Sequence, residues 1–171
     1  MIAEDIRGWK GKPKELVAYL TEKIAGNEAF FGEVIELLKT GSKVDKGTCA
    51  DILKHVSAVK PELVAPYIDD LIPYINYDLP RVKWGIPEAL GNVSAKYPVE
   101  AAKAIPKLLI NTADESTVVR WCAAFAISEI AKNNPLAQKA LIPKMQALAA
   151  AENNSGVKNV YVKALKKINK K

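Results

Sequence analysis

The 171-residue sequence is poor in the side chains from which most catalytic and metal sites are built. It has one histidine, His55, and two cysteines, Cys49 and Cys122, which lie far apart in the chain. Zinc sites and disulfide frameworks need clustered ligands or closely spaced cysteines. We therefore expect two buried free thiols and neither a metal ion nor a cofactor.

Catalytic pairs are equally scarce. A histidine-activated nucleophile could be built only around His55, and Cys49 lies six positions earlier, about 120° away by helical phase. Asp69 and Asp70 are adjacent, so they point to different faces of a helix rather than toward one substrate atom. Since no glycine-rich phosphate loop follows a strand, the sequence predicts no catalytic residues.

Long apolar runs are also missing. No stretch approaches the roughly 18 uncharged apolar residues of a membrane helix, and the N-terminal MIAEDIRGWK carries acidic residues before its first basic one, unlike a signal peptide. A content of 49% hydrophobic and 26% charged residues is typical of a globular protein. We expect one cytoplasmic domain over residues 1–171 that folds without staples.

The charge is unevenly distributed along the chain. The net charge is +6, yet residues 116–171 carry 10 basic and 2 acidic side chains, whereas residues 1–115 carry 15 basic and 17 acidic ones. This asymmetry suits an acidic partner, nucleic acid included. Lysines at helix ends are also common as solubilising caps, and the last turns hold Lys163, Lys166, Lys167, Lys170 and Lys171.

What the sequence has in abundance is repetition. The segment VKWGIPEALGNVSAKYP (82–98) returns 37 residues later as VRWCAAFAISEIAKNNP (119–135), and the same shift aligns Pro61, Pro98 and Pro135. A shift of 38 carries the pattern into a fourth copy near the C-terminus. A fixed period of this length is typical of a solenoid built from helical hairpins.

Each copy contains two segments of helical periodicity separated by a polar break. The first helices are predicted at 28–40, 63–75, 99–112 and 137–151, and the second helices at 44–59, 82–97, 117–133 and 156–169. A capping helix is predicted at 13–25, opened by Pro13. No segment alternates with period two, so we expect no sheet, and prolines inside helices should bend them: Pro73, Pro87, Pro106 and Pro143. The predicted units are an N-terminal cap at 1–27 and repeats at 28–60, 61–97, 98–134 and 135–171.

Two of the repeats share an acidic residue in the turn between their helices and a Val-Arg or Val-Lys dipeptide near the start of the second helix. Pro106 is followed by Asp114 and Val119-Arg120, and Pro143 by Glu152 and Val157-Lys158. This pattern resembles the armadillo-like HEAT-repeat family over about residues 28–169. The resemblance implies an all-α, right-handed α-α superhelix of about four hairpins, whose second helices line a concave surface, and a role as a scaffold. In the second unit Tyr77 stands where the turn acid should be.

Helical phase divides each second helix into two faces. In the middle unit the predicted core face is Val82, Ile86, Ala89, Leu90, Val93 and Tyr97. The opposite face holds Trp84, Glu88, Gly91 and Ala95, with the shifted counterparts Trp121, Phe125, Ser128 and Lys132. The resemblance implies that this face forms a groove, together with Asp51, Lys54 and Ala58 from the first unit and Asn159, Lys163, Lys166 and Lys170 from the fourth.

Two readings remain open for the residues singled out in this way. The tryptophans either form a contact surface or fold over neighbouring repeats. The basic residues at the flank of each second helix either pair with turn acids of neighbouring repeats or contact phosphate. These flank residues are Lys46, Lys83, Arg120 and Lys158, and the acids are Asp78, Asp114 and Glu152.

Taken together, the sequence favours a non-enzymatic scaffold that binds an acidic protein segment. The predicted contact residues are Trp84, Trp121, Phe125, Lys132, Lys163, Lys166 and Lys170. The alternatives are nucleic-acid binding led by the lysines of the fourth unit with Arg120 and Lys158, and a subunit of a larger assembly whose aromatic residues are buried against another chain. A further alternative is a HEAT-like alkylpurine DNA glycosylase, whose groove would contain the outward acids Asp51 and Glu88 without either matching a catalytic Asp.

Overall fold

The computed structural model describes residues 1–170, and this part of the chain is entirely helical, without strands. The N-terminal half contains α1 (Ile2–Gly8), α2 (Pro13–Gly26), α3 (Phe30–Thr40), α4 (Lys43–Val59), α5 (Pro61–Val64), η1 (Ala65–Tyr67), α6 (Ile68–Leu71), η2 (Ile72–Tyr74) and α7 (Pro80–Val93). The C-terminal half contains α8 (Pro98–Ala102), α9 (Ile105–Asn111), α10 (Thr117–Asn133), α11 (Pro135–Ala151) and α12 (Ser155–Ile168). The all-α prediction is confirmed. None of the helices between residues 1 and 170 is long and apolar enough to cross a membrane.

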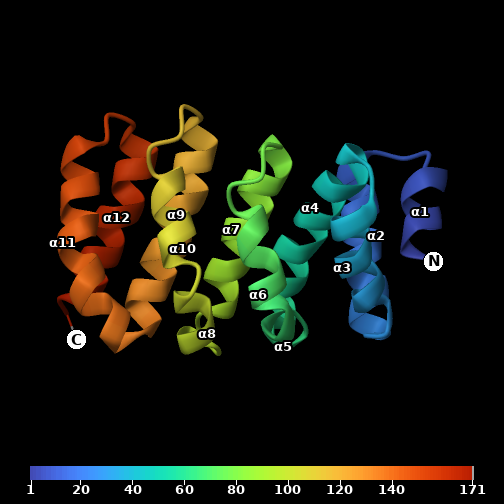
Figure 1. The fold of residues 1–171 in the computed structure, drawn as a ribbon, viewed down its shortest axis with the longest axis horizontal. Coiled ribbons are helices and arrows are strands. Elements are labelled where there is room, and N and C mark those ends of the chain that lie inside the picture. The colour runs from blue at the N-terminus through green and yellow to red at the C-terminus, as the bar shows by residue number, and fades with distance from the viewer. Residues whose placement is uncertain (171) are drawn as a thin grey trace.

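The helices form pairs that stand side by side in chain order, with the two termini at opposite ends of the molecule (Figure 1). The second helices α2, α4, α7, α10 and α12 contact one another in that sequence. The helices α4, α7, α10 and α12 also pack against the first helix of their pair or against the short segments that replace it. Successive second helices therefore form a continuous layer through which each pair meets the next.

Side-chain caps explain where several second helices begin. Ser42, Ser116 and Asn154 each accept a hydrogen bond from the backbone N–H three residues ahead, at the start of α4, α10 and α12. Such a cap satisfies a donor that the helix leaves free. The polar breaks noted in the sequence thus contain the residues that start the second helices.

The N-terminal cap differs from the prediction. It is a pair of helices rather than one, because α1 precedes α2 and packs against α3 while α2 packs against α4. Ile2 is fully buried, and its backbone N–H donates to Glu33 Oε2 at 2.8 Å. A helix of seven residues is too short for periodicity to reveal, and tertiary packing holds it in place.

Prolines interrupt the first helices of the second and third pairs, where the sequence predicted only bends. Pro66 and Pro73 lie in the 3-10 turns η1 and η2, so that α5 and α6 are single short turns. Pro106 opens α9, which is separated from α8 by Lys103 and Ala104. Pro87 and Pro143 lie inside α7 and α11, which continue through them.

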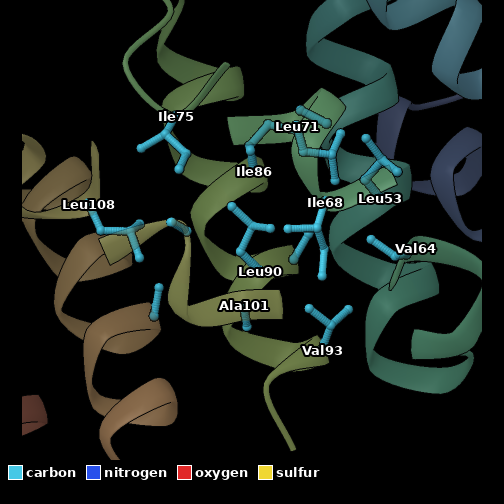
Figure 2. Close-up of a cluster of buried hydrophobic side chains, with 14 of the residues drawn as sticks. Leu53, Val64, Ile68, Leu71, Ile75, Ile86, Leu90, Val93, Ala101 and Leu108 are labelled. Atoms are coloured by element: carbon cyan, nitrogen blue, oxygen red, sulfur yellow. The ribbon is translucent and has the colours of Figure 1, made fainter. Parts of the chain in front are cut away.

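The core runs between consecutive pairs. Side chains from α4, α6, α7 and α8 meet in it, including Leu53, Ile68, Leu90 and Ala101 (Figure 2). The predicted core face of α7 is confirmed, since Val82, Ile86, Ala89, Leu90 and Val93 are all fully buried and Tyr97 is half-buried. The opposite face of the second helices is consequently the one available for contacts.

Candidate interaction surface

We call the side chains of α2, α4, α7, α10 and α12 that point away from the core the second-helix surface. Its exposed aromatic side chains include Trp121 of α10, which has a relative exposure of 37%, and Tyr19 of α2, which has one of 41%. The Trp121 ring stacks on Phe125, one helical turn later, with ring centroids 5.7 Å apart and planes within 4° of parallel. The two rings together form a flat apolar patch on α10.

Phe125 lies across the neighbouring helix. A Cβ atom built at Gly91 of α7 would come within 2.8 Å of the Phe125 ring, so the ring occupies the space above that glycine. Gly91 and Ser128 were predicted to face outward, and both are buried. The prediction was wrong for these two residues because it considered one helix at a time, whereas side chains of the next helix can cover a small residue.

Trp84 occupies a different environment from its counterpart. It is half-buried, and its indole Nε1 is buried without a hydrogen-bond partner among the described residues. The two tryptophans share a position in the repeat, yet only Trp121 presents an exposed ring. Trp84 therefore contributes more to packing than to an open surface.

The charges on the α4 and α7 part of the surface are paired internally. Glu88 lies 3.2 Å from Lys54 Nζ and accepts a hydrogen bond from Cys122 Sγ at 3.4 Å. Arg81 contacts Asp51 through Nη2 at 2.5 Å and Nε at 3.1 Å. Sequence reasoning missed both pairs, since each joins residues about 30 positions apart on neighbouring helices.

The charges on α12 are not compensated in this way. Lys163, Lys166, Lys167 and Lys170 are exposed, and none of them lies within ion-pair distance of a carboxylate in residues 1–170. The sequence from 153 to 170 contains five lysines and no acid. Lys132 of α10 instead pairs with Glu129 on its own helix. The C-terminal end of the surface is therefore strongly positive.

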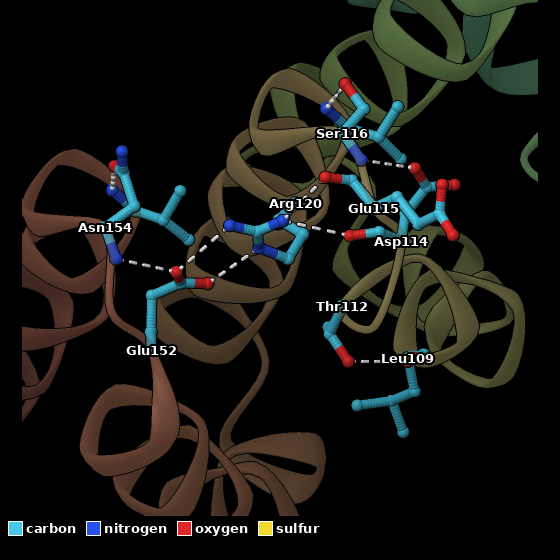
Figure 3. A network of polar contacts seen from close by, with 10 residues as sticks. Leu109, Thr112, Asp114, Glu115, Ser116, Arg120, Glu152 and Asn154 are labelled. Atoms are coloured by element: carbon cyan, nitrogen blue, oxygen red, sulfur yellow. Dashed lines mark hydrogen bonds and ion pairs between the residues drawn. The ribbon is translucent and has the colours of Figure 1, made fainter.

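Two of the predicted ion pairs between the basic flank residues and the turn acids are present. Lys83 Nζ lies 2.9 Å from Asp114 Oδ2. Arg120 binds Glu152 through two nitrogens, at 2.9 and 3.2 Å, and also donates to the Asp114 carbonyl oxygen (Figure 3). The hydrogen bonds from Arg120 hold the pKa of Glu152 below its usual range. Burial alone would raise the pKa of Asp114, but the Ser116 N–H and Lys83 outweigh it and the net shift is downward.

The first and last flank residues, Lys46 and Lys158, form no ion pair with a turn acid in residues 1–170. Lys46 does not meet Asp78; its Nζ donates to the carbonyl oxygens of Leu38 and Lys39 at the end of α3, and it lies 5.8 Å from the centre of the Tyr77 ring. Tyr77 stands where the other units have an acid, so a cation–π contact replaces the ion pair. Lys158 is exposed and has no carboxylate within ion-pair distance in residues 1–170.

The nucleophile and metal candidates are dispersed. Cys49 is buried, and burial raises the pKa of its thiol to about 12; burial also raises the pKa of the Cys122 thiol. His55 is exposed, and its Nδ1 lies 2.7 Å from the Asp51 carbonyl oxygen. Within residues 1–170, no group of three His, Cys, Asp or Glu side chains could hold a metal ion.

Two recesses lie along the second helices. One of about 520 Å³ opens between α2 and α4 and is lined by Pro13, Lys14, Val17, Ala18, Asp51 and His55. A smaller one of about 160 Å³ lies where α7, α10 and α12 end, beside Lys132, Asn133 and Lys167. Neither collects groups that resemble a catalytic arrangement.

Comparison with known proteins supports the fold alone. Neither protein-family models nor curated proteins give a match to the sequence. Among solved structures, the chain is similar to an engineered protein whose crystal structure was determined by the Northeast Structural Genomics Consortium, with a TM-score of 0.69 and 23% sequence identity. The match covers 82% of this chain and 64% of that protein.

Proposed function

We propose that this protein is a HEAT-type α-solenoid and a non-enzymatic interaction module of the cytoplasm. The proposal rests on the tandem repeat with its turn acids and Val-Arg or Val-Lys dipeptides, and on helical pairs that stand in chain order along the molecule (Figure 1). The second-helix surface then corresponds to the surface that binds partners in this family. The partner is an acidic segment of another protein.

One observation carries this function: the exposed Trp121, stacked on the half-buried Phe125, lies on the helix next to the lysine-rich α12. An exposed aromatic patch supplies most of the contact energy of a small interface. Uncompensated lysines beside it attract carboxylates and speed association. An acidic segment that carries an apolar side chain satisfies both features.

The alternatives receive less support from the same contacts. Arg120, expected to help bind nucleic acid, is held by Glu152 on its flank. Asp51 and Glu88, the outward acids of the predicted groove, are each held in an ion pair on the surface. Nucleic-acid binding nevertheless remains a measurable outcome, because phosphate also binds exposed lysines.

The test is a selection of displayed random short peptides against the intact protein. We expect the enriched peptides to combine Asp or Glu with an aromatic or other apolar residue. Replacing Trp121 with Ala should weaken their binding about tenfold or more, as for a central aromatic contact. Circular dichroism should be unchanged, because the ring is exposed.

Leu136→Ala is the matched control, since Leu136 is an exposed apolar residue at the start of α11. It should leave peptide affinity unchanged. Enrichment of non-acidic peptides would overturn the acidic partner. No enrichment together with duplex DNA binding that falls steeply with salt would overturn the proposal in favour of a nucleic-acid partner.

A further inference from the structure

The recess between α2 and α4 reflects a looser contact than the one on the other side of α4. Helix α4 lies against α7 more extensively than against α2, although α2 and α7 are equally long. The close approach of α7 depends on Gly85, where a Cβ atom would lie 2.5 Å from the Ala50 carbonyl oxygen. Helix α2 has no glycine before Gly26 at its end. Side chains therefore hold α2 and α4 apart, and a recess of about 520 Å³ remains between them.

One wall of this recess is apolar. It consists of Pro13, Val17 and Ala18 at the start of α2. Val17 is buried, whereas Pro13 and Ala18 are exposed. A recess of this size, with apolar side chains and a small number of polar groups, is typical of sites that bind small molecules. The α2 wall is therefore suited to the apolar part of a small ligand.

The charges that border the recess are not balanced. Its ionisable lining residues are Lys14 of α2 and Asp51 and His55 of α4. Asp51 is the only carboxylate among the lining residues, and its Oδ2 is bound by Arg81, with Nη2 at 2.5 Å and Nε at 3.1 Å. Lys14 is exposed and takes part in none of the ion pairs among residues 1–170. The edge of the recess therefore carries a positive charge without a counter-ion.

His55 is oriented by a contact within its own helix. Its Nδ1 lies 2.7 Å from the Asp51 carbonyl oxygen, and because a carbonyl oxygen only accepts hydrogen bonds, Nδ1 carries a proton. Nε2 makes no hydrogen bond within residues 1–170. When both ring nitrogens are protonated, Nε2 can donate to an anion while Nδ1 keeps the backbone contact. Lys14 and His55 thus provide one donor from each of the two helices that border the recess.

We propose that this recess binds a small apolar carboxylate, with its apolar body against the α2 wall and its carboxylate between Lys14 and His55. An amine of the same shape is disfavoured, because Arg81 already neutralises Asp51 and Lys14 repels a second cation. The site lies near the N-terminal end of the row of helices, away from α10 and α12 (Figure 1). It is a second binding site, independent of the acidic partner segment.

The probe that tests this site is naphthoate, which joins a flat apolar ring system to a carboxylate. His55 is the only histidine of the chain, so its Hε1 proton gives a single, assignable NMR signal. Naphthoate added to the intact protein should shift this signal in a saturable way. Acetate, which lacks the rings, should bind at least about tenfold more weakly, because it buries almost no apolar surface. Naphthylmethylamine, which keeps the rings and reverses the charge, should also bind more weakly.

Two substitutions locate the ligand. Ala18→Trp should fill the recess and abolish the naphthoate shift, and because Ala18 is exposed, the circular dichroism spectrum should not change. Lys14→Gln should weaken naphthoate binding about three- to fivefold, as for an exposed charge pair, without weakening binding of the amine. Lys139→Gln in α11, at the opposite end of the molecule, is the matched charge control and should leave naphthoate binding unchanged.

Three results would overturn the inference: a naphthoate shift that persists in Ala18→Trp, equal affinity for the acid and the amine, or no saturable shift in the unmodified protein. None of them bears on the proposed function, which is tested through acidic enrichment and Trp121.

Discussion

At the scale of single residues, glycines set how closely the second helices approach. A Cβ atom at Gly85 would lie 2.5 Å from the carbonyl oxygen of Ala50, which belongs to the backbone of α4 and cannot rotate away. Gly91 provides the equivalent space beneath Phe125. These positions have ordinary backbone angles, so it is the contact rather than the conformation that requires glycine.

This contact predicts the effect of adding one methyl group. Gly85→Ala should lower the free energy of unfolding by about 1–3 kcal/mol, since α4 and α7 must move apart. Gly32→Ala in α3 is the control, because a Cβ atom there meets nothing within 4 Å; it should be neutral or raise stability by up to about 1 kcal/mol. Urea denaturation measures both, and equal values would contradict the close contact.

At the scale of helices, a line of polar contacts joins each repeat to the following one. These contacts differ in chemistry. Lys46 makes a cation–π contact with the Tyr77 ring, Lys83 forms an ion pair with Asp114, and Arg120 donates two hydrogen bonds to Glu152. Glu152 and Arg120 have side-chain exposures of 10% and 21%, so this last pair is shielded from water more than an ordinary surface pair. It should therefore contribute most to the docking of the final pair of helices.

The Arg120 and Glu152 contact predicts a pH-dependent mutant effect. Glu152→Gln should destabilise the protein by about 1–2 kcal/mol at neutral pH, because it removes a charge-assisted hydrogen bond. The folded-state pKa of Glu152 is depressed, so this stability is present above the unfolded pKa of about 4.3 and is lost as pH falls below it.

Denaturation of wild type and variant between pH 7 and pH 3 checks this sign. The stability difference should shrink on acidification. Glu36→Gln is the control, since Glu36 is 71% exposed and lies 4.0 Å from Lys39, and it should change stability by less than about 0.5 kcal/mol. A difference that stays constant with pH would show that Glu152 contributes through packing alone.

At the scale of the molecule, the helical pairs interact mainly with their neighbours in the row (Figure 1). Interior second helices are packed on both sides, whereas α1 and α12 lie at the ends. In such an array the stability is approximately a sum of units and of the interfaces between them. The lysines of α12 occupy positions that Phe125 and Ser128 fill in the preceding unit, so this end presents charge rather than apolar surface.

Amide hydrogen exchange should show this one-dimensional organisation. We expect the slowest exchange in α4, α7 and α10, and faster exchange in α1 and at the C-terminal turns of α12, because local opening begins where neighbours are missing. Uniform protection along the chain would instead indicate a single cooperative unit. The measurement needs no ligand and applies to the protein as it stands.

The sequence by itself determined the all-α class, the long second helices and the buried face of α7. Periodicity and caps are local properties, and the 37-residue repeat copies them, so α10 was predicted at its observed bounds and the buried face of α7 residue by residue. It did not reveal α1, whose few residues form a helix only because Ile2 is buried against the next pair.

Only the tertiary structure decided which part of the second-helix surface is open. Trp84 and Trp121 are identical in type and position within the repeat, and helical phase cannot separate them. Trp84 of α7 is half-buried with its indole Nε1 enclosed, whereas Trp121 of α10 is 37% exposed. The helices that pack against α7 and α10 come from distant parts of the sequence, so this difference exists only once the helices are packed.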